Sequence, residues 1–308
     1  MRLGFGLPQV GPAVGPDVLV TAAQRAEALG FDDVWVFDRV LWPIAPRAPY
    51  PASADGRLPD VCKTVLDPLE TLAFVAAHTR HIGLGTSVLN LPYYNPVLLA
   101  RQLSTIDVLS RGRLRVGFGT GWSPDEFEAV GATMKGVGKR TDEALRVLKT
   151  IWTTDPVCFA GDHYRVPESF IGPKPVQKPH PPIYWAAYTP AALRRVARDA
   201  NGWLPAGIPI DGMRQMFDLI KRMAQEAGRD PTALELVVRA NVYLSETPLG
   251  SARAIFTGTS EELRADINAT RQLGAAALIF DLQFSPSIDS IEALTQWMER
   301  LRTLAEGS

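Results

Sequence analysis

Short apolar runs rich in β-forming residues alternate with amphipathic helical patterns from one end of the chain to the other. Strands that are separated by helices form parallel sheets, because each helix carries the chain back to the same edge of the sheet. The pattern predicts an α/β protein with eight strands. We expect them at residues 3–7, 34–37, 82–88, 114–118, 183–186, 202–204, 236–243 and 277–280.

Start signals mark the helices between these strands. Asp67 is a capping residue, Pro68 fits the first helical position, and Glu70 has the spacing of a reciprocal capping box. Asn95 and Pro96 have the same cap-then-proline order at the start of the next helix. These local signals predict where the helices begin.

Eight strands and about as many helices favour a closed (β/α)8 TIM barrel with insertion loops over an open, doubly wound sheet. No linker rich in Pro, Gly and Ser divides the chain, and no G-x-G-x-x-G motif follows the first strand. That motif would be the usual reason to prefer the open sheet. We therefore expect a single barrel domain over residues 1–308, with the open sheet as the alternative.

Composition limits the partners of such a barrel. Lys plus Arg number 32 and Asp plus Glu 33, so the net charge of −1 favours neither nucleic acid nor an anionic membrane. Neither a membrane-spanning stretch nor a signal peptide is evident. The widely spaced Cys62 and Cys158 and the four histidines fit neither a disulfide framework nor a metal site. We expect a cytoplasmic protein that binds a small-molecule substrate and holds no metal.

Three stretches are longer than ordinary connections between strands and helices. They are residues 42–65, 122–138 and 158–182. Long loops of this kind are candidates for lids or substrate-shaping segments. For the third stretch, which contains six prolines, a rigid surface excursion is an equal alternative.

The carboxyl ends of the strands carry the active sites of (β/α)8 barrels. Polar residues that follow the predicted strands are therefore the first candidates for function. They are Asp38 and Arg39, residues 86–90, residues 120–126, Tyr188 and Thr189, and Asp281 and Gln283.

Two local patterns at these ends have two interpretations each. Thr189 and Pro190 predict a helix N-terminus, which either binds a phosphate through its free N–H groups or is an ordinary cap. Gly83 and Gly85 either allow a ligand to approach the third strand or reflect a tapered barrel interior.

Several segments in this order resemble the luciferase-like monooxygenase superfamily, and specifically its branch that depends on the deazaflavin coenzyme F420. The resemblance extends over most of the chain. The segments that carry it are GFDDVWVFD at 30–38, IGLGTSV at 82–88, YNP at 94–96, SRGRLRVGFGTGW at 110–122 with Glu126 and Phe127, and AALRR at 191–195 with Asp199, Gly202 and Trp203.

The resemblance implies a homodimer and a cofactor ring lying over the third strand, at a bulge with a non-prolyl cis peptide at Ser87–Val88. The implied cofactor-binding residues are Thr86, Ser87, Val88, Asn90, Thr120, Gly121, Ala187, Tyr188 and Thr189. Ala187 and Tyr188 replace a Gly-Gly pair that holds the cofactor phosphate in the family. Arg39 replaces a frequent His, and Trp122 replaces an acidic residue of the related sugar-phosphate dehydrogenases, so we expect a different substrate.

The catalytic candidates are Asp38, Arg39 and Trp122. Asp38 orients polar groups of the ring or substrate, or is a buried carboxylate that pairs with Arg39 or caps a loop. Arg39 suits an anionic or carbonyl group of the substrate. Trp122 forms a substrate wall with Trp42, or packs in the core. For Glu126 we favour a capping box with Ser123.

Three functions follow from these features. The first is an F420-dependent oxidoreductase that transfers a hydride between the deazaflavin and a small organic substrate. The second is an FMN-dependent monooxygenase that uses reduced flavin and dioxygen. The third is a cofactor-free binding barrel. The TSV stretch at 86–88 and the GTG stretch at 119–121 resemble the F420 branch more closely.

Overall fold

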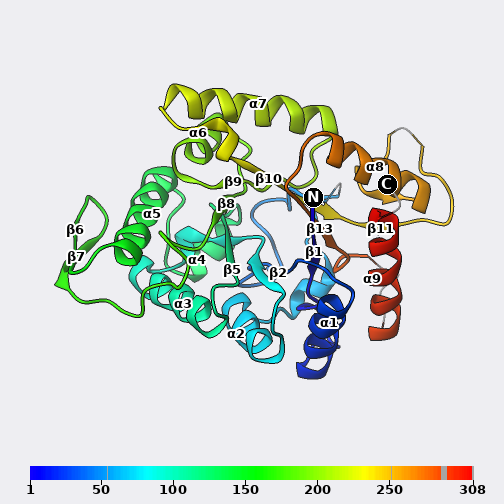
Figure 1. Ribbon diagram of the computed structural model, residues 1–308, viewed down its shortest axis with the longest axis horizontal. Coiled ribbons are helices and arrows are strands. Elements are labelled where there is room, and N and C mark those ends of the chain that lie inside the picture. Colours follow the sequence, from blue (N-terminus) through cyan, green and yellow to red (C-terminus); the bar gives the residue numbers. More distant parts are fainter. Residues whose placement is uncertain (54, 251, 286–289, 307–308) are drawn as a thin grey trace.

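Eight parallel strands close into a barrel in the computed structural model, which describes residues 1–53, 55–250, 252–285 and 290–306 (Figure 1). Around the barrel they are β1 (Arg2–Gly6), β2 (Asp33–Val36), β3 (Gly83–Thr86), β5 (Leu114–Gly119), β8 (Ile183–Trp185), β9 (Gly202–Trp203), β10 (Glu235–Asn241) and β13 (Ala277–Asp281). The pairings of β3 with β5 and of β13 with β1 close the ring. The predicted barrel is confirmed, and the open sheet is wrong.

Helices surround the barrel, and the first and last lie side by side (Figure 1). They are α1 (Pro16–Ala28), α2 (Pro68–His78), α3 (Pro96–Leu109), α4 (Pro124–Ala129), α5 (Val137–Thr153), α6 (Pro190–Asp199), α7 (Ile210–Glu226), α8 (Ser260–Gln272) and α9 (Ile291–Glu306). None of the described helices is long and apolar enough to cross a membrane.

The predicted caps of α2 and α3 are confirmed. Asp67 accepts hydrogen bonds from the backbone N–H groups of Leu69 and Glu70, and Asn95 accepts them from the first turn of α3. The Glu70 side chain does not accept the expected hydrogen bond from the backbone N–H of Asp67 in the described part of the chain. Its carboxyl group instead hydrogen-bonds to that of Asp67, which raises the pKa of Glu70.

The interior of the barrel is filled by side chains where the strands carry glycine. A Cβ atom at Gly85 would lie 2.3 Å from the Trp35 ring, and one at Gly83 would lie 1.9 Å from Oδ1 of Asp33. These glycines therefore make room for side chains of β2 inside the barrel. Of the two interpretations of Gly83 and Gly85, the tapered interior is the one that the structure supports.

Ion pairs close the barrel at the N-terminal ends of its strands. Arg2 pairs with Glu235 at 2.8 Å, and Arg115 pairs with Asp33. The Tyr184 hydroxyl donates to Glu235 at 2.6 Å. The opposite end, where the carboxyl ends of the strands lie, is the mouth of the barrel and the usual place of the active site in this fold.

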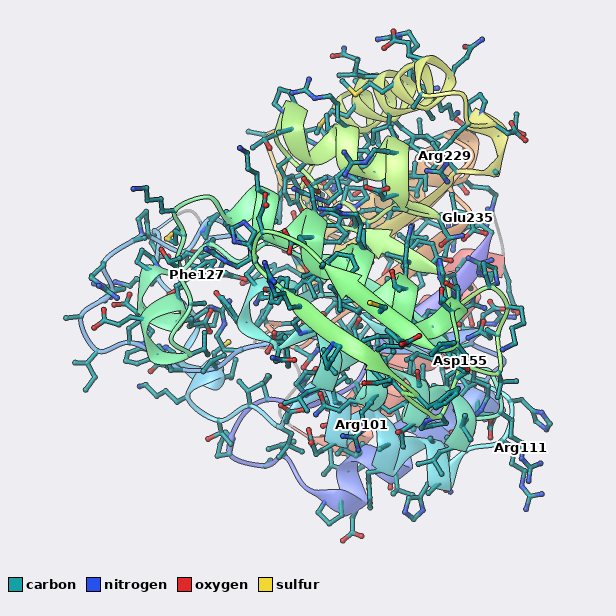
Figure 2. All side chains as sticks on the ribbon, turned by 90° about the vertical axis from the view of Figure 1, so that its left-hand side faces the viewer. Arg101, Arg111, Phe127, Asp155, Arg229 and Glu235 are labelled. Atoms are coloured by element: carbon teal, nitrogen blue, oxygen red, sulfur yellow. The ribbon has the colours of Figure 1, made fainter. Side chains whose placement is uncertain are left out.

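The three long connections have different structures. Within residues 42–65, the described residues include a short 3-10 helix, η1 (Asp60–Lys63), and a single β-bridge from Val65 to Val10. Residues 122–138 contain α4, which Figure 2 places on the opposite side of the molecule from Arg111 and Asp155 at the N-terminal end. The third connection carries an antiparallel hairpin of β6 (Val157–Ala160) and β7 (Arg165–Ser169) at the outer surface beside α5 (Figures 1 and 2). This placement favours the surface excursion over a lid.

Candidate active site

Asp38 lies at the mouth, directly beyond the end of β2, with 6% of its surface exposed. Its Oδ2 atom accepts a hydrogen bond from the backbone N–H of Asn90 at 3.0 Å. Burial raises the pKa of Asp38 to about 7; the Glu126 carboxylate acts in the same direction, and hydrogen bonds from Asn90 and Tyr94 act against it. A carboxyl group with such a pKa can accept or donate a proton near neutral pH.

Arg39 forms a buried ion pair with Glu126 of α4, not with Asp38. The Nη1 atom of Arg39 lies 3.1 Å from Oε2 of Glu126, and their side chains are 8% and 0% exposed. Glu126 also accepts hydrogen bonds from the backbone N–H of Val40 at 2.8 Å and from the Tyr93 hydroxyl at 3.2 Å. Of the alternatives given for Asp38, the pairing with Arg39 is therefore wrong, and its carboxylate instead holds the backbone beyond β3.

The expected capping box of α4 is only half formed. The Ser123 hydroxyl accepts from the backbone N–H of Glu126 at 3.3 Å, as a cap should. The Glu126 side chain does not return to Ser123, because its carboxylate binds Arg39 and Val40. The Ser123 half of the capping box is confirmed and the Glu126 half is wrong, because the Glu126 carboxylate holds the loop after β2 against α4.

Two aromatic rings cover the guanidinium group of Arg39. Its Cζ atom lies 5.2 Å from the centre of the Trp122 ring and 5.8 Å from that of Tyr50. The two rings contact each other, with centres 5.5 Å apart. Trp42, the expected partner of Trp122, instead has Lys63 over its ring at 4.5 Å. Tyr50, which sequence analysis missed, is thus the aromatic neighbour of Trp122.

The chain beyond β3 has the predicted cis peptide bond at Ser87–Val88. Thr86 stands before it, and its hydroxyl both donates to the carbonyl of Gly117 and accepts from the N–H of Gly117, each at 2.9 Å. Thr86 thus joins β3 to β5 through its side chain. The Ser87 hydroxyl is buried and has no hydrogen-bond partner in the described structure.

Arg239 of β10 reaches the same region. It donates hydrogen bonds to the Ser87 carbonyl and to Oδ1 of Asn241, and it forms an ion pair with Asp281 at the end of β13. Sequence analysis selected Asp281 but missed Arg239. The available signal was an arginine that follows the apolar residues 236–238 of a strand, because a charge in a buried strand needs a partner.

The remaining candidates of β4 and β5 lie close to this group. Asn90 ends the two-residue strand β4 (Leu89–Asn90) and is 9% exposed. Thr120 and Gly121 follow β5. Gly121 has a φ of +73°, and a Cβ atom there would lie 2.7 Å from the Tyr93 hydroxyl. Only glycine fits this tight turn beneath Tyr93.

The segment before α6 forms the expected helix cap. The Thr189 hydroxyl accepts from the backbone N–H of Ala192 at 3.3 Å. Ala187 is 1% exposed, and its carbonyl accepts from the Trp203 indole N–H at 2.9 Å. Tyr188 is 53% exposed, and its hydroxyl accepts from the N–H of Ala206 at 3.2 Å.

The sequence model of luciferase-like monooxygenases matches residues 3–277 of this chain. The chain belongs to that family. Its luciferase-like relatives include an uncharacterized protein of Mycobacterium tuberculosis, 33% identical over 212 residues, which are 68% of this chain and 74% of the relative. The family supports an enzyme of the oxidoreductase or monooxygenase class.

Two further relatives of this luciferase-like protein have named activities. The F420-dependent glucose-6-phosphate dehydrogenase of Amycolatopsis mediterranei is 32% identical over 62% of this chain and 53% of its own length. The FMNH2-dependent dimethylsulfone monooxygenase of Pseudomonas putida is 33% identical over 58% of this chain and 49% of its own length. Relatives of this chain thus use either a deazaflavin or a flavin.

Solved structures share the fold of this luciferase-like chain. Monooxygenase RslO1 from Streptomyces bottropensis superposes with a TM-score of 0.80 and 24% identity, covering 100% of this chain and 99% of its own. An F420-dependent secondary alcohol dehydrogenase, in complex with an F420–acetone adduct, superposes with a TM-score of 0.77 and 17% identity over 98% of this chain and 97% of its own. At these identities the likeness establishes the barrel architecture.

Proposed function

We propose that this protein is an F420-dependent oxidoreductase that transfers a hydride between the deazaflavin and a small organic substrate. The observation that carries the proposal is a buried carboxyl group, that of Asp38, beside the cis peptide after β3. The backbone N–H of Asp38 donates to the carbonyl of Val88 at 3.1 Å. The acid and the bulge are therefore held in one rigid unit.

Two buried polar atoms at the mouth fit a cofactor with hydrogen-bonding edges. Oγ of Ser87 and Nε of Arg39 are both buried without a partner in the described structure. An unsatisfied buried donor costs about 1–3 kcal/mol, so a polar ring edge that reaches these atoms would recover that energy.

The start of α6 suits the phosphorylated tail of such a cofactor. The Thr189 cap leaves N–H groups of the first turn available, and the helix dipole favours negative charge there. Ala187 replaces a family glycine, and its side chain is buried in the protein. Tyr188 is the side chain that would contact the tail.

The side chains at the mouth would have separate roles in the reaction. When bound, the deazaflavin would supply the hydride chemistry. Asp38 would donate or accept the proton that accompanies hydride transfer at a substrate oxygen. The Glu126 ion pair fixes Arg39 below the rings of Trp122 and Tyr50. Because Glu126 neutralises Arg39, we expect an uncharged carbonyl or hydroxyl substrate and not a sugar phosphate.

FMN is the second candidate cofactor, because a relative with 33% identity depends on reduced FMN. A fluorescence titration of the purified protein with F420 and with FMN distinguishes the candidates. We expect saturable binding of F420 and weaker binding of FMN. Saturable binding of FMN alone would select the monooxygenase, and binding of neither would select the cofactor-free barrel.

A matched pair of serine variants locates the binding site. Ser87→Ala removes the unpartnered hydroxyl at the mouth, whereas Ser104→Ala removes an equally buried, unpartnered hydroxyl on α3. We expect Ser87→Ala to weaken F420 binding by about fivefold, the value of one hydrogen bond. Ser104→Ala should bind as the wild type does. The homodimer and the cytoplasmic location stay predictions of the sequence.

A further inference from the structure

Arg239 of β10 makes contacts on the opposite side of the barrel. Three strands separate β10 from β3 in either direction around the ring, so the two strands lie across the barrel from each other. The Nη1 atom of Arg239 nonetheless donates a hydrogen bond to the carbonyl of Ser87, directly beyond β3. The side chain of Arg239, of which 12% is exposed, therefore reaches across the mouth.

Each nitrogen of the Arg239 guanidinium group has its own acceptor. Nη1 bonds the Ser87 carbonyl, Nη2 pairs with Oδ2 of Asp281 on the neighbouring strand β13, and Nε donates to Oδ1 of Asn241 at 3.1 Å. Asp281 is itself held, because its Oδ1 atom accepts from the backbone N–H of Gln283 at 2.9 Å. Since a guanidinium group is planar and rigid, bonds to three separate groups fix both its position and its orientation.

The Phe37 ring lies against the same guanidinium group. Cζ of Arg239 is 5.5 Å from the centre of this ring. The Gln9 side chain accepts from the backbone N–H of Phe37 at 2.6 Å and donates to the Phe37 carbonyl at 2.8 Å. Arg239 therefore packs on a ring whose backbone is held through both of its polar groups.

These contacts place Arg239 on both sides of the hydrogen bond that joins Asp38 to the chain beyond β3. The backbone N–H of Asp38 donates to the carbonyl of Val88 at 3.1 Å. The residues that directly precede these two, Phe37 and Ser87, are the ones that Arg239 contacts. A displacement of Arg239 would therefore disturb the carboxyl group and the Ser87–Val88 segment together.

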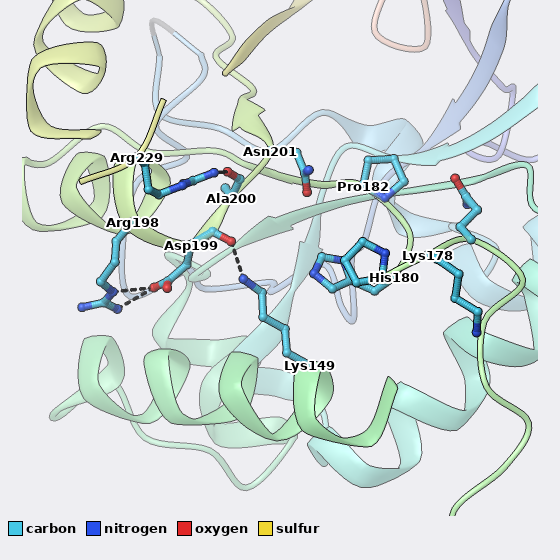
Figure 3. Close-up of a pocket in the computed structure, with 11 residues that line it drawn as sticks. Lys149, Lys178, His180, Pro182, Arg198, Asp199, Ala200, Asn201 and Arg229 are labelled. Atoms are coloured by element: carbon cyan, nitrogen blue, oxygen red, sulfur yellow. Dashed lines mark hydrogen bonds and ion pairs between the residues drawn. The ribbon is translucent and has the colours of Figure 1, made fainter. Parts of the chain in front are cut away.

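Other cations of the barrel have a simpler role at a helix end. Lys149 donates to the carbonyl of Asp199 at 2.6 Å, at the end of α6 (Figure 3). Arg229 donates to the carbonyl of Ala200, the next residue, at 2.8 Å (Figure 3). Cations in this place offset the partial negative charge of a helix C-terminus. Helix capping does not explain Arg239, because its acceptors lie on β10, on β13 and beyond β3.

We propose that Arg239 is a positioning residue of the cofactor site, holding the Ser87–Val88 segment and the chain at Asp38 in a fixed arrangement that the cofactor ring meets. This inference rests on the proposed function. The ion pair with Asp281 would by itself neutralise Arg239, so the bond to Ser87 has a separate role. That bond occupies the Ser87 carbonyl, while the Ser87 hydroxyl is buried without a partner in the described structure.

Fluorescence titration of Arg239→Lys with F420 and with FMN tests this role. Lysine keeps the positive charge beside Asp281, but its compact ammonium group lacks the planar fork that bonds three separate acceptors. We expect the affinity for F420 to fall by about tenfold, because a charge-assisted hydrogen bond that holds the site is lost. Arg115→Lys is the matched control: Arg115 pairs with the buried Asp33 at the opposite end of the barrel, and this variant should bind F420 as the wild type does.

A double-mutant cycle with Ser87→Ala distinguishes a positioning role from a purely structural one. If Arg239 acts through Ser87, loss of the hydroxyl has little further effect once the segment has shifted. We expect Arg239→Lys/Ser87→Ala to lose about tenfold in affinity, and not about fiftyfold, the product of the two single effects. Asp281→Asn removes the charge that orients Arg239 and should also weaken binding. If Arg239→Lys does not fold, Asp281→Asn takes its place in the cycle.

The outcomes separate this inference from the proposed function. If the wild type binds FMN and not F420, the proposed function fails, and the same cycle measured with FMN decides the role of Arg239. Binding of neither cofactor overturns both. With either cofactor, the inference is overturned if folded Arg239→Lys binds as the wild type does, if Arg115→Lys weakens binding equally, or if the two single effects multiply. Circular dichroism verifies that each variant is folded.

Discussion

The carboxyl group of Asp38 is shielded from water at the end of β2, and this burial raises its pKa to about 7. The activity of the protein should therefore change with an inflection near pH 7. In Asp38→Asn the side-chain oxygen can still accept from Asn90, but the group cannot exchange a proton. We expect turnover to fall by about 100-fold or more and the inflection to disappear. A pH profile of turnover that keeps the inflection in the variant would remove Asp38 from the mechanism.

The same carboxyl group makes stability depend on pH. Its pKa rises from an ordinary value of 3.8 to about 7 in the folded protein, so between these values the folded state holds a proton that the unfolded state has lost. The contribution of Asp38 to stability therefore falls as pH rises through this window, by up to about 4 kcal/mol. Urea unfolding at pH 4 and pH 7 should show a smaller fall for Asp38→Asn than for the wild type. An equal fall in both proteins would contradict the raised pKa.

Glu126 and Glu128 provide a matched test of the buried ion pair. Glu126→Gln leaves the buried Arg39 without a charged partner, whereas Glu128→Gln affects an ion pair with Arg47 in which the Glu128 side chain is 74% exposed. We expect the first change to lower the free energy of unfolding by about 3 kcal/mol or more. The second should change it by less than about 1 kcal/mol. Equal effects in urea denaturation would mean that Arg39 is not held by Glu126.

At the level of elements, the Trp35 ring of β2 packs against β3 at Gly85, where there is no side chain. A methyl group at Gly85 would overlap the Trp35 ring inside the barrel, whereas one at Gly172 meets no atom within 4 Å. We expect Gly85→Ala to destabilise the protein by about 1–3 kcal/mol through overpacking. Gly172→Ala should leave the urea midpoint nearly unchanged. A Gly85→Ala variant as stable as the wild type would mean that the interior is looser than described.

Strands and helix starts could be predicted because their signals are local. The cap at Asp67 and the apolar run of β13 are each specified by neighbouring residues. The contacts of the candidate site have no such signature. Glu126 binds Arg39 from 87 positions away, and Arg239 reaches Ser87 across 152 positions. Only the closed barrel brings these residues together. The sequence therefore predicted which end of the barrel carries the candidate residues, but not which of them contact one another.

At the scale of the whole molecule, the two ends of the barrel hold different groups. Ion pairs such as Arg2 with Glu235 fill the N-terminal end of the strand ring. The mouth gathers Asp38, Arg39 and the cis peptide at Ser87–Val88. This separation allows one end to stabilise the barrel while the other performs chemistry.

A crystal structure of the protein grown with F420 tests the central claim most directly. Our account predicts density for the deazaflavin ring against Ser87–Val88, within hydrogen-bonding reach of Oγ of Ser87, and density for the phosphate at the start of α6 near Thr189. Density for the coenzyme at any other place on the barrel, with the mouth filled by protein side chains, would contradict it.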